Sequence, residues 1–200
     1  MNKSDNLSVA GCVLAGGGSR RMGTDKALLE LDGKPLIMLA LECFEAFPEV
    51  FISAADVDIY AFTGFRVIPD ELPGAGPLAG MASALKAADA DYVCFRPVDA
   101  PLAPAGLHPM LANACFGRDA AVPTSSGLPE PLFACFSKTA LPVLESLLAD
   151  GKLKAADAFQ LLDTAFVPLD SPEVKIRLGD PSVYLVNAND PDTFSKLGKR

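Results

Sequence analysis

The chain has 200 residues, half of them hydrophobic, and a formal net charge of −8. A chain of this length fits a single domain over residues 1–200 and buries about 70% of the surface that it exposes when unfolded. The acidic balance argues against a nucleic-acid-binding surface, which needs a basic face. Neither a signal peptide nor an apolar run long enough to span a membrane is visible, so the sequence predicts a cytoplasmic protein.

Strand and helix candidates alternate along most of the chain. Apolar runs bounded by turn residues predict strands at residues 7–14, 50–53, 65–68, 92–95, 120–122, 132–136, 165–169 and 183–186. Apolar periodicity and helix-start prolines predict helices at residues 35–41, 55–63, 78–88, 104–115, 141–148, 155–162 and 191–197. The alternation predicts an α/β fold of three layers, with helices on both faces of a mainly parallel sheet. Residues 119–136 are expected to be an insertion or a strand pair of mixed direction.

A glycine-rich segment, VLAGGGSRRMGTDK at residues 13–26, lies between the first predicted strand and the first predicted helix. Adjacent glycines let the backbone turn tightly and present N–H groups to an anion. Arg20, Arg21 and Lys26 add positive charge where a polyphosphate would lie. The segment is not a Walker loop, because Thr24 and Asp25 follow Gly23 where that pattern requires lysine and then serine or threonine. It is not the dinucleotide-binding loop G-x-G-x-x-G either, because Arg21 stands in place of the third glycine. The alternative interpretation is a generic glycine loop with solvated basic residues.

Polar residues also follow three further predicted strands, namely Ser53, Asp70 and Asp99. Ligands of parallel sheets bind outside the carboxyl ends of the strands, so these residues and the glycine-rich segment are expected to converge. Prolines on both sides of Asp99 restrict its backbone, which suits a ligand of Mg²⁺. The alternatives are a turn or helix-start residue for Asp99 and an exposed turn residue for Asp70.

The cysteines and the histidine predict no metal or redox site. Five cysteines are widely spread without a C-x-x-C pair, and buried reduced thiols are expected at Cys12, Cys43, Cys94, Cys115 and Cys135. The one histidine, His108, is expected to be an ordinary helix residue. A structural zinc site is therefore not expected.

The segment LAGGxSRRMGxDKALLxLxGKPLI, at residues 14–37, resembles the opening signature of the molybdenum cofactor guanylyltransferases, which belong to the nucleotidyltransferases. Residues 76–81, GPLAGM, are similar to a second family motif, although helix initiation explains them equally well. The segment around Asp99 resembles the family's D-x-P motif, whose aspartate holds magnesium. The resemblance covers nearly the whole chain, with motifs that are specific up to residue 101 and weaker beyond it.

The resemblance implies a Rossmann-like nucleotidyltransferase fold and transfer of GMP from GTP to molybdenum-bearing molybdopterin, with release of pyrophosphate. It implies Mg²⁺ as the cofactor, GTP and molybdopterin as binding partners, and molybdoenzyme maturation proteins as further partners. Catalytic roles fall on Arg21, Lys26 and Asp99, with Asp99 as the metal ligand. Nucleotide contacts fall on Leu14, Ala15, Gly16, Gly17, Lys26, Ser53, Asp70 and Asp99.

Two features depart from the family pattern or are weakly defined. Ser53 stands where many relatives carry an asparagine that faces the base, although a hydroxyl can still donate or accept a hydrogen bond. Contacts to the pterin are expected from Lys154, Asn187 and Asn189. For the two asparagines, capping of a helix that begins at Pro191 is an alternative of similar weight.

Three other functions stay open: cytidylyl transfer to molybdopterin, nucleotidyl transfer to a sugar phosphate, and a non-catalytic molybdopterin carrier. Relatives that transfer cytidylyl groups usually read L-A-A-G where this chain reads L-A-G-G at residues 14–17. Gly16 has no Cβ and leaves more room for a purine, which favours guanine. A carrier would need neither Lys26 nor Asp99.

Overall fold

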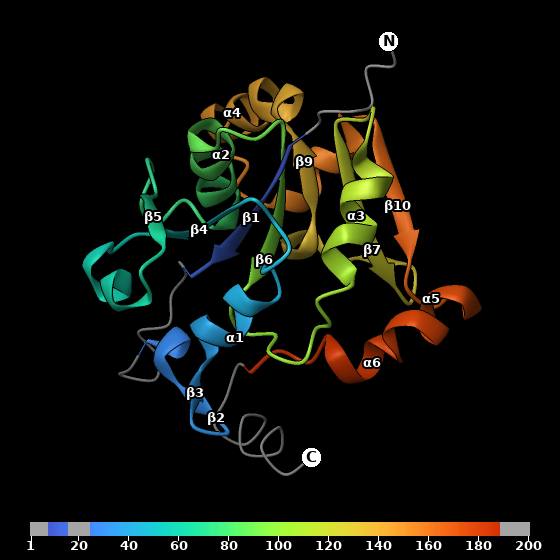
Figure 1. Cartoon of the computed structure of the whole chain (residues 1–200). Coiled ribbons are helices and arrows are strands. Elements are labelled where there is room, and N and C mark those ends of the chain that lie inside the picture. Colours follow the sequence, from blue (N-terminus) through green and yellow to red (C-terminus); the bar gives the residue numbers. More distant parts are fainter. Residues whose placement is uncertain (1–7, 16–24, 189–200) are drawn as a thin grey trace.

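The computed structural model describes residues 8–15 and 25–188 of the chain (Figure 1). In this part of the chain, eight strands form one sheet in the order β10-β7-β9-β6-β1-β4-β5, and β8 pairs with β7. The strands of this sheet are β1 (Val9–Leu14), β4 (Glu49–Ala54), β5 (Arg66–Pro69), β6 (Tyr92–Pro97), β7 (Ala120–Ser125), β8 (Leu128–Pro129), β9 (Cys135–Ser137) and β10 (Thr164–Pro168). Two short strands, β2 (Glu30–Leu31) and β3 (Lys34–Pro35), pair separately.

Helices connect most of these strands. The α-helices are α1 (Leu36–Glu42), α2 (Pro77–Ala87), α3 (Leu107–Cys115), α4 (Leu141–Ala149), α5 (Pro172–Leu178) and α6 (Pro181–Tyr184). Short 3₁₀ helices are η2 (Lys26–Leu28), η3 (Asp58–Thr63), η4 (Pro131–Phe133), η5 (Lys138–Ala140) and η6 (Ala155–Gln160). None of the helices in the described residues is long and apolar enough to cross a lipid bilayer.

The sheet is mainly parallel, as the sequence predicts. Strands β4, β1 and β6 run parallel beside one another, and β5 extends them in the same direction. Strand β9 runs against both β6 and β7, so the mixed direction expected for residues 119–136 is confirmed. Strand β8 also runs antiparallel to β7, so the part of the sheet beyond β6 contains two reversed strands, β8 and β9, in an otherwise parallel arrangement (Figure 1).

Two apolar cores lie on opposite faces of the sheet and confirm the three-layer arrangement. Side chains along β1 alternate, so that Val13 packs with α1 and α3 on one face, while Cys12 and Leu14 pack with α2 and α4 on the other. This period of two is the ordinary geometry of a strand buried on both faces. Each fully buried Leu, Ile or Phe side chain contributes about 1.5–3 kcal/mol, so these layers hold the strand ends in place.

Some predicted elements differ from the structure near the C-terminal end. The strand predicted at residues 183–186 is wrong, because Asp180 accepts a hydrogen bond from the Ser182 N–H and starts α6 at Pro181. Helix α5 was not predicted; it begins where Ser171 caps the Val174 N–H. Residues 155–162 form a 3₁₀ helix over only part of their length.

Two further differences concern the middle and the end of the chain. Pro131 begins a 3₁₀ turn, so the strand predicted at residues 132–136 pairs only from Cys135 onward. The helix predicted at residues 191–197 lies outside the described residues.

The cysteines and the histidine lie as predicted. All five cysteines are free thiols, and four of them are buried, while Cys43 is half-buried. His108 is a fully buried residue of α3.

Candidate active site

The carboxyl ends of four parallel strands meet at one edge of the sheet. Leu14 at the end of β1 is in register with Ser53 in β4 and with Pro97 in β6, and Ser53 is in register with Ile68 in β5. Backbone hydrogen bonds continue beyond the strands, from the Ala15 N–H to the Ser53 carbonyl and from the Val98 N–H to the Leu14 carbonyl. The convergence predicted from the sequence is therefore present, and it gathers Ala15, Ser53, Asp70 and Asp99 at one edge.

Ser53 and Asp70 form a pair beneath this edge. The buried Ser53 hydroxyl donates to Asp70 Oδ1 at 3.0 Å. Burial raises the pKa of the Asp70 carboxyl, and the hydrogen bond from Ser53 lowers it in part. A carboxylate at this place can accept further hydrogen bonds from a ligand.

Gly80 of α2 packs directly against this pair. A Cβ atom at Gly80 would lie 2.8 Å from Ser53 Oγ, closer than real Cβ contacts, and 3.0 Å from Asp70 Oδ1, which is a tight contact. The last glycine of the GPLAG segment thus lets the helix backbone approach the pair, which the sequence pattern alone did not reveal.

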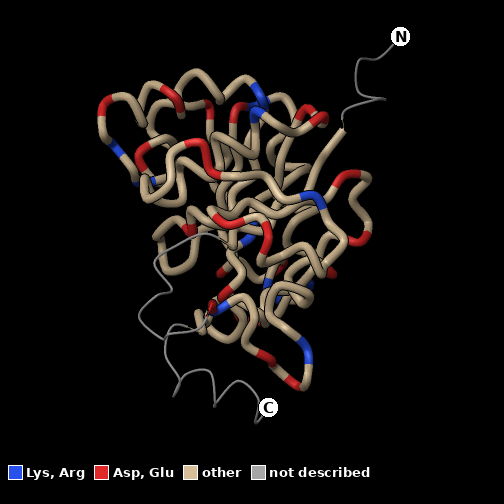
Figure 2. The backbone as a smooth tube through the Cα atoms, turned by 90° about the vertical axis from the view of Figure 1, so that its left-hand side faces the viewer, with Lys and Arg blue, Asp and Glu red and all other residues tan. Residues whose placement is uncertain are grey.

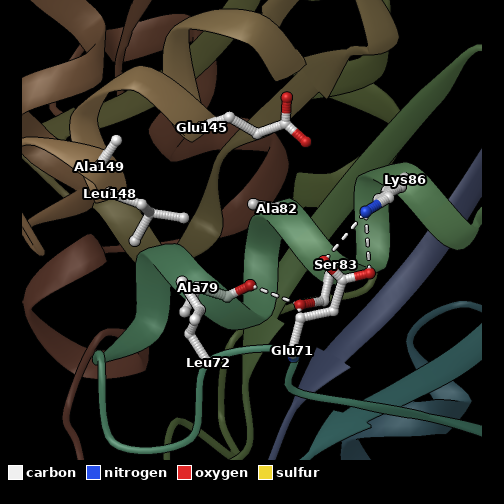
Figure 3. Close-up of a pocket in the computed structure, with 9 residues that line it drawn as sticks. All are labelled: Glu71, Leu72, Ala79, Ala82, Ser83, Lys86, Glu145, Leu148 and Ala149. Atoms are coloured by element: carbon white, nitrogen blue, oxygen red, sulfur yellow. Dashed lines mark hydrogen bonds and ion pairs between the residues drawn. The ribbon is translucent and has the colours of Figure 1, made fainter.

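A surface pocket of about 500 Å³ between α2 and α4 adjoins the chain just after Asp70 (Figure 3). On its wall, the Ser83 hydroxyl accepts a hydrogen bond from the Glu71 N–H and donates to the Ala79 carbonyl. Lys86 makes an exposed ion pair with Glu71, also drawn in Figure 3. These contacts hold Glu71, the residue after Asp70, against α2. The wall of the pocket therefore helps to fix the position of the Ser53–Asp70 pair.

Asp25 and Lys26 begin the short helix η2. Asp25 is its N-cap residue, and its Oδ1 accepts a hydrogen bond from the Ala27 N–H at 3.0 Å. The other oxygen, Oδ2, accepts from the Tyr60 hydroxyl at 2.7 Å. Tyr60 belongs to no sequence motif and was not predicted as a site residue.

Asp99 lies just beyond the end of β6 and interacts electrostatically with Lys26. Burial raises the pKa of the Asp99 carboxyl, and the positive charge of Lys26 lowers it. The structure therefore brings Lys26, the first residue of η2, near Asp99 after β6, although the two predicted residues are 73 positions apart in the sequence.

The turn that follows Asp99 is anchored by a buried guanidinium. Arg96, the penultimate residue of β6, is fully buried and donates to the Ala100 carbonyl at 2.7 Å and the Ala103 carbonyl at 2.8 Å. Burial lowers the pKa of Arg96. Arg96 was not predicted as a site residue, because hydrogen bonds from a side chain to backbone carbonyls leave no residue pattern.

Two of the three residues predicted to contact the pterin, Asn187 and Lys154, belong to the described structure. The Ala188 N–H donates to the Asp99 carbonyl at 2.6 Å, which brings the exposed neighbour Asn187 to the Asp99 turn. Lys154 is exposed and precedes η6, and the carbonyl of Leu153 lies 3.5 Å from the Cβ position of Gly76 at the start of α2. Gly16, Gly17, Arg21 and Asn189 lie outside the described residues.

Within residues 8–15 and 25–188, no group of three or more histidine, cysteine or acidic side chains is placed to hold a metal ion. Mg²⁺ in nucleotide-dependent enzymes is usually bound by one or two carboxylates together with substrate phosphates and water. A single carboxylate at a strand end, beside a lysine that can contact phosphate, fits this kind of metal site. Asp99 has that position.

The basic residues are distributed unevenly along the sequence. Figure 2 shows lysine and arginine positions scattered singly among more numerous acidic ones. The predicted basic residues Arg20, Arg21 and Lys26 are by contrast concentrated in seven consecutive positions of the sequence.

Comparison with known proteins gives a consistent result. Residues 11–165 match the model of the MobA-like NTP transferase domain. The chain is 33% identical to a probable molybdenum cofactor guanylyltransferase of Carboxydothermus hydrogenoformans, over 97% of this chain and 96% of the relative. It is 36% identical to a protein of the same name from Methanothermobacter thermautotrophicus, over 90% of this chain and 94% of that protein.

Solved structures agree with these sequence matches. Molybdopterin-guanine dinucleotide biosynthesis protein A from Archaeoglobus fulgidus superposes with a TM-score of 0.80 at 25% identity, over 95% of this chain and 97% of that chain. The 2-C-methyl-D-erythritol 4-phosphate cytidylyltransferase of Thermus thermophilus has a TM-score of 0.71 at 19% identity, over 96% and 98%. The second likeness concerns the fold alone.

Proposed function

Because the chain belongs to the family of MobA-like NTP transferase domains, we propose that it transfers GMP from GTP to molybdopterin. A terminal phosphate oxygen of molybdenum-bearing molybdopterin attacks the α-phosphorus of GTP. The bond between the α-phosphorus and the oxygen bridging to the β-phosphate breaks, and pyrophosphate leaves. The product is the molybdopterin guanine dinucleotide. One domain over residues 1–200 performs this reaction in the cytoplasm, as the sequence predicts.

One observation carries the proposal: Lys26 and Asp99 interact at the carboxyl ends of neighbouring strands, in a chain whose relatives are named guanylyltransferases. Nucleotidyl transfer needs no covalent intermediate with the protein. The protein's task is to position the reactants and to neutralise charge. A cation and an acidic residue at one place serve both tasks.

The nucleotide is assigned to the strand ends. The backbone from Leu14 through Ala15, Gly16 and Gly17 holds the triphosphate together with Arg21 and Lys26. The Ser53–Asp70 pair faces the base, where its remaining hydrogen-bonding capacity can meet the guanine edge. Of these residues, Leu14, Ala15, Lys26, Ser53 and Asp70 belong to the described structure.

Asp99 is assigned to Mg²⁺. Asp99 would hold the ion, which would supply positive charge to offset the negative charge of the phosphates. Burial of Asp99 and the anchoring of its turn by Arg96 and Ala188 support this role, because a ligand carboxylate must keep its position. The pterin is assigned to Lys154, Asn187 and Asn189. Molybdoenzyme maturation proteins would receive the finished dinucleotide.

The experiment incubates the purified protein with molybdopterin, Mg²⁺ and each nucleoside triphosphate in turn, and measures pyrophosphate. The proposal predicts release with GTP that depends on molybdopterin. A molybdopterin carrier would release none, and a cytidylyltransferase would respond to CTP. A sugar-phosphate enzyme would release pyrophosphate only after molybdopterin is replaced by a sugar phosphate.

A further inference from the structure

Tyr60 connects Ala15 and Asp25, the described residues on either side of residues 16–24. Its hydroxyl lies 2.7 Å from Asp25 Oδ2 and 3.2 Å from the Ala15 carbonyl oxygen. Tyr60 is 35 positions from Asp25 and 45 from Ala15 in the chain. Since a phenol has one proton, the short contact to the carboxylate is the stronger hydrogen bond, and the carbonyl is the weaker alternative acceptor.

Tyr60 itself is rigidly held. Its side chain is 1% exposed and packs in the core beneath α1. The Thr63 hydroxyl donates to the Tyr60 carbonyl at 2.7 Å, and Gly64 ends η3 in the left-handed region with a φ of 75°. Burial, and next the hydrogen bond to Asp25, raise the pKa of Tyr60 above its usual range, so the phenol keeps its proton. The hydroxyl is therefore a fixed donor.

Asp25 links the fixed hydroxyl of Tyr60 to the backbone at Lys26. Both carboxylate oxygens of Asp25 are engaged, Oδ2 with Tyr60 and Oδ1 with the Ala27 N–H. A rotation of the carboxylate would break both hydrogen bonds at once. Because the Ala27 bond caps η2, and Lys26 is the first residue of η2, the orientation of Asp25 determines where the Lys26 backbone lies.

We propose that Tyr60 is a positioning residue for nucleotidyl transfer, acting through Asp25 to place Lys26 against the triphosphate. The proposal rests on the function proposed above, since it assumes that Lys26 meets a nucleotide. It assigns a role to Tyr60 and to the carboxylate of Asp25. Asp25 belongs to the glycine-rich segment, but no role was predicted for it from the sequence. Tyr60 touches no substrate; it acts only by fixing the start of η2.

The first test is Tyr60→Phe, which removes the hydroxyl and keeps the buried ring. A hydrogen bond to a charged group contributes about 1.5–3 kcal/mol, equivalent to roughly 10-fold to 150-fold in a rate ratio. We expect kcat/KM for the nucleotide to fall by at least 10-fold, mainly through kcat, in protein that stays folded at the assay temperature, with a melting temperature lower by no more than about 12 °C. An unchanged kcat/KM overturns the proposal.

Tyr92→Phe is the matched control. The Tyr92 hydroxyl also takes part in one long-range hydrogen bond, accepting from the Gly117 N–H at 3.2 Å. That bond joins β6 to the segment after α3 and lies at the amino end of β6, away from the strand-end site. The proposal predicts no change in kcat/KM there. An equal loss in both variants would mean that any lost tyrosine hydroxyl disturbs the fold, and would overturn a specific role for Tyr60.

The second test separates positioning from a general structural effect. If Tyr60 acts through Asp25, Tyr60→Phe combined with Asp25→Asn should be no slower than Asp25→Asn alone. Fully additive losses overturn the proposal, because the two residues would then act independently. All ratios are taken per folded molecule and with whichever triphosphate the unaltered protein uses. A protein that prefers CTP would thus refute guanylyl transfer and leave the test of Tyr60 intact.

Discussion

At the scale of single residues, the proposed role of Asp99 requires a carboxylate that stays charged, although it is partly buried, and that keeps its position. Burial raises its pKa, and the positive charge of the neighbouring Lys26 opposes this effect. Its turn is held by Arg96, which donates to the Ala100 and Ala103 carbonyls, and by the Ala188 N–H, which donates to the Asp99 carbonyl. Such support suits a ligand carboxylate better than a surface turn.

Asp99→Asn keeps the side-chain shape and removes the charge. We expect Mg²⁺-dependent pyrophosphate release to be lost, with a melting temperature that is unchanged or slightly higher, because burying a charge is unfavourable. Asp89→Asn, an exposed aspartate beyond the amino end of β6, is the matched control and should keep full activity. A melting temperature many degrees lower in Asp99→Asn, with the folded remainder still active, would favour the cap interpretation.

The sequence predicted the residues that carry motifs and missed those that support them. Lys26, Ser53, Asp70 and Asp99 follow predicted strands, and the common edge of a parallel sheet is enough to bring them together. Tyr60 acts on the same site from a segment predicted only as a short helix. Its partners are 35 and 45 positions away, and such distant pairs leave no local pattern in one sequence.

At the scale of elements, α2 matters because its backbone comes unusually close to β4 and to the chain after β5. Gly80 makes this approach possible, since a methyl group there would overlap the Ser53 hydroxyl and the Asp70 carboxylate. Both neighbours are ends of short side chains, so they can move aside. The helix would then survive, and the hydrogen-bonded pair would not.

Gly80→Ala tests this separation of stability from function. Alanine favours a helix over glycine by about 1 kcal/mol, which offsets part of the cost of breaking the Ser53–Asp70 hydrogen bond, so the melting temperature should fall by only a few degrees. Displacing the Ser53–Asp70 pair should lower kcat/KM for the nucleotide by about 10-fold or more, in line with one methyl group in a tight pocket. Enzyme kinetics and thermal unfolding of the same samples give both numbers.

Ala82→Gly is the converse change in the same helix. Ala82 faces the pocket between α2 and α4, so its methyl group does not meet the pair. We expect a loss of about 1 kcal/mol in stability with unchanged nucleotide kinetics. If Gly80→Ala leaves kcat/KM intact, the pair does not contribute to nucleotide binding in the way proposed.

The type of each element could be predicted wherever apolar periodicity was clear. The predictions were wrong where a helix cap or a proline determined the local conformation. Residues 183–186 contain the apolar run of a strand, yet the Asp180 cap and Pro181 start a helix just before it. Likewise, Pro131 imposes a turn on a segment of high strand propensity. In both places one local hydrogen bond or one fixed φ angle outweighs the pattern of hydrophobicity.

At the scale of the whole molecule, the core beneath α1 and α3 contains a buried histidine that must stay neutral. His108 packs against Phe44, with ring centroids 4.4 Å apart, and its Nδ1 lies 3.4 Å from the Ala105 carbonyl oxygen. Burial, and next the charge of Arg96, lower the pKa of His108 from 6.5 to about 3. The sequence identified this residue as structural, but not its neighbour Arg96 as the second cause.

This histidine predicts a pH dependence of stability. Between pH 6.5 and about pH 3 the unfolded chain binds a proton at His108 that the folded protein does not bind. Stability should therefore be complete above pH 6.5 and fall with decreasing pH, by up to about 1.4 kcal/mol per pH unit. Asp70, Asp99 and Glu130 oppose this trend, because their folded pKa values are raised.

Comparing the unaltered protein with His108→Gln removes these opposing contributions, since both proteins share them. Denaturant unfolding at several pH values should show that the free energy of unfolding declines more steeply in the unaltered protein below pH 6.5. Above pH 6.5 the difference between the two proteins should be constant. Parallel curves over the whole range would contradict a buried neutral histidine.

The measurement that tests the central claim most directly is a competition between nucleotides. The unaltered protein receives molybdenum-bearing molybdopterin, Mg²⁺ and equal concentrations of GTP and CTP, and the products are identified by mass spectrometry. We predict that molybdopterin guanine dinucleotide accumulates together with one equivalent of pyrophosphate. A cytosine dinucleotide as the main product, or no dinucleotide from either nucleotide, would contradict guanylyl transfer by this site.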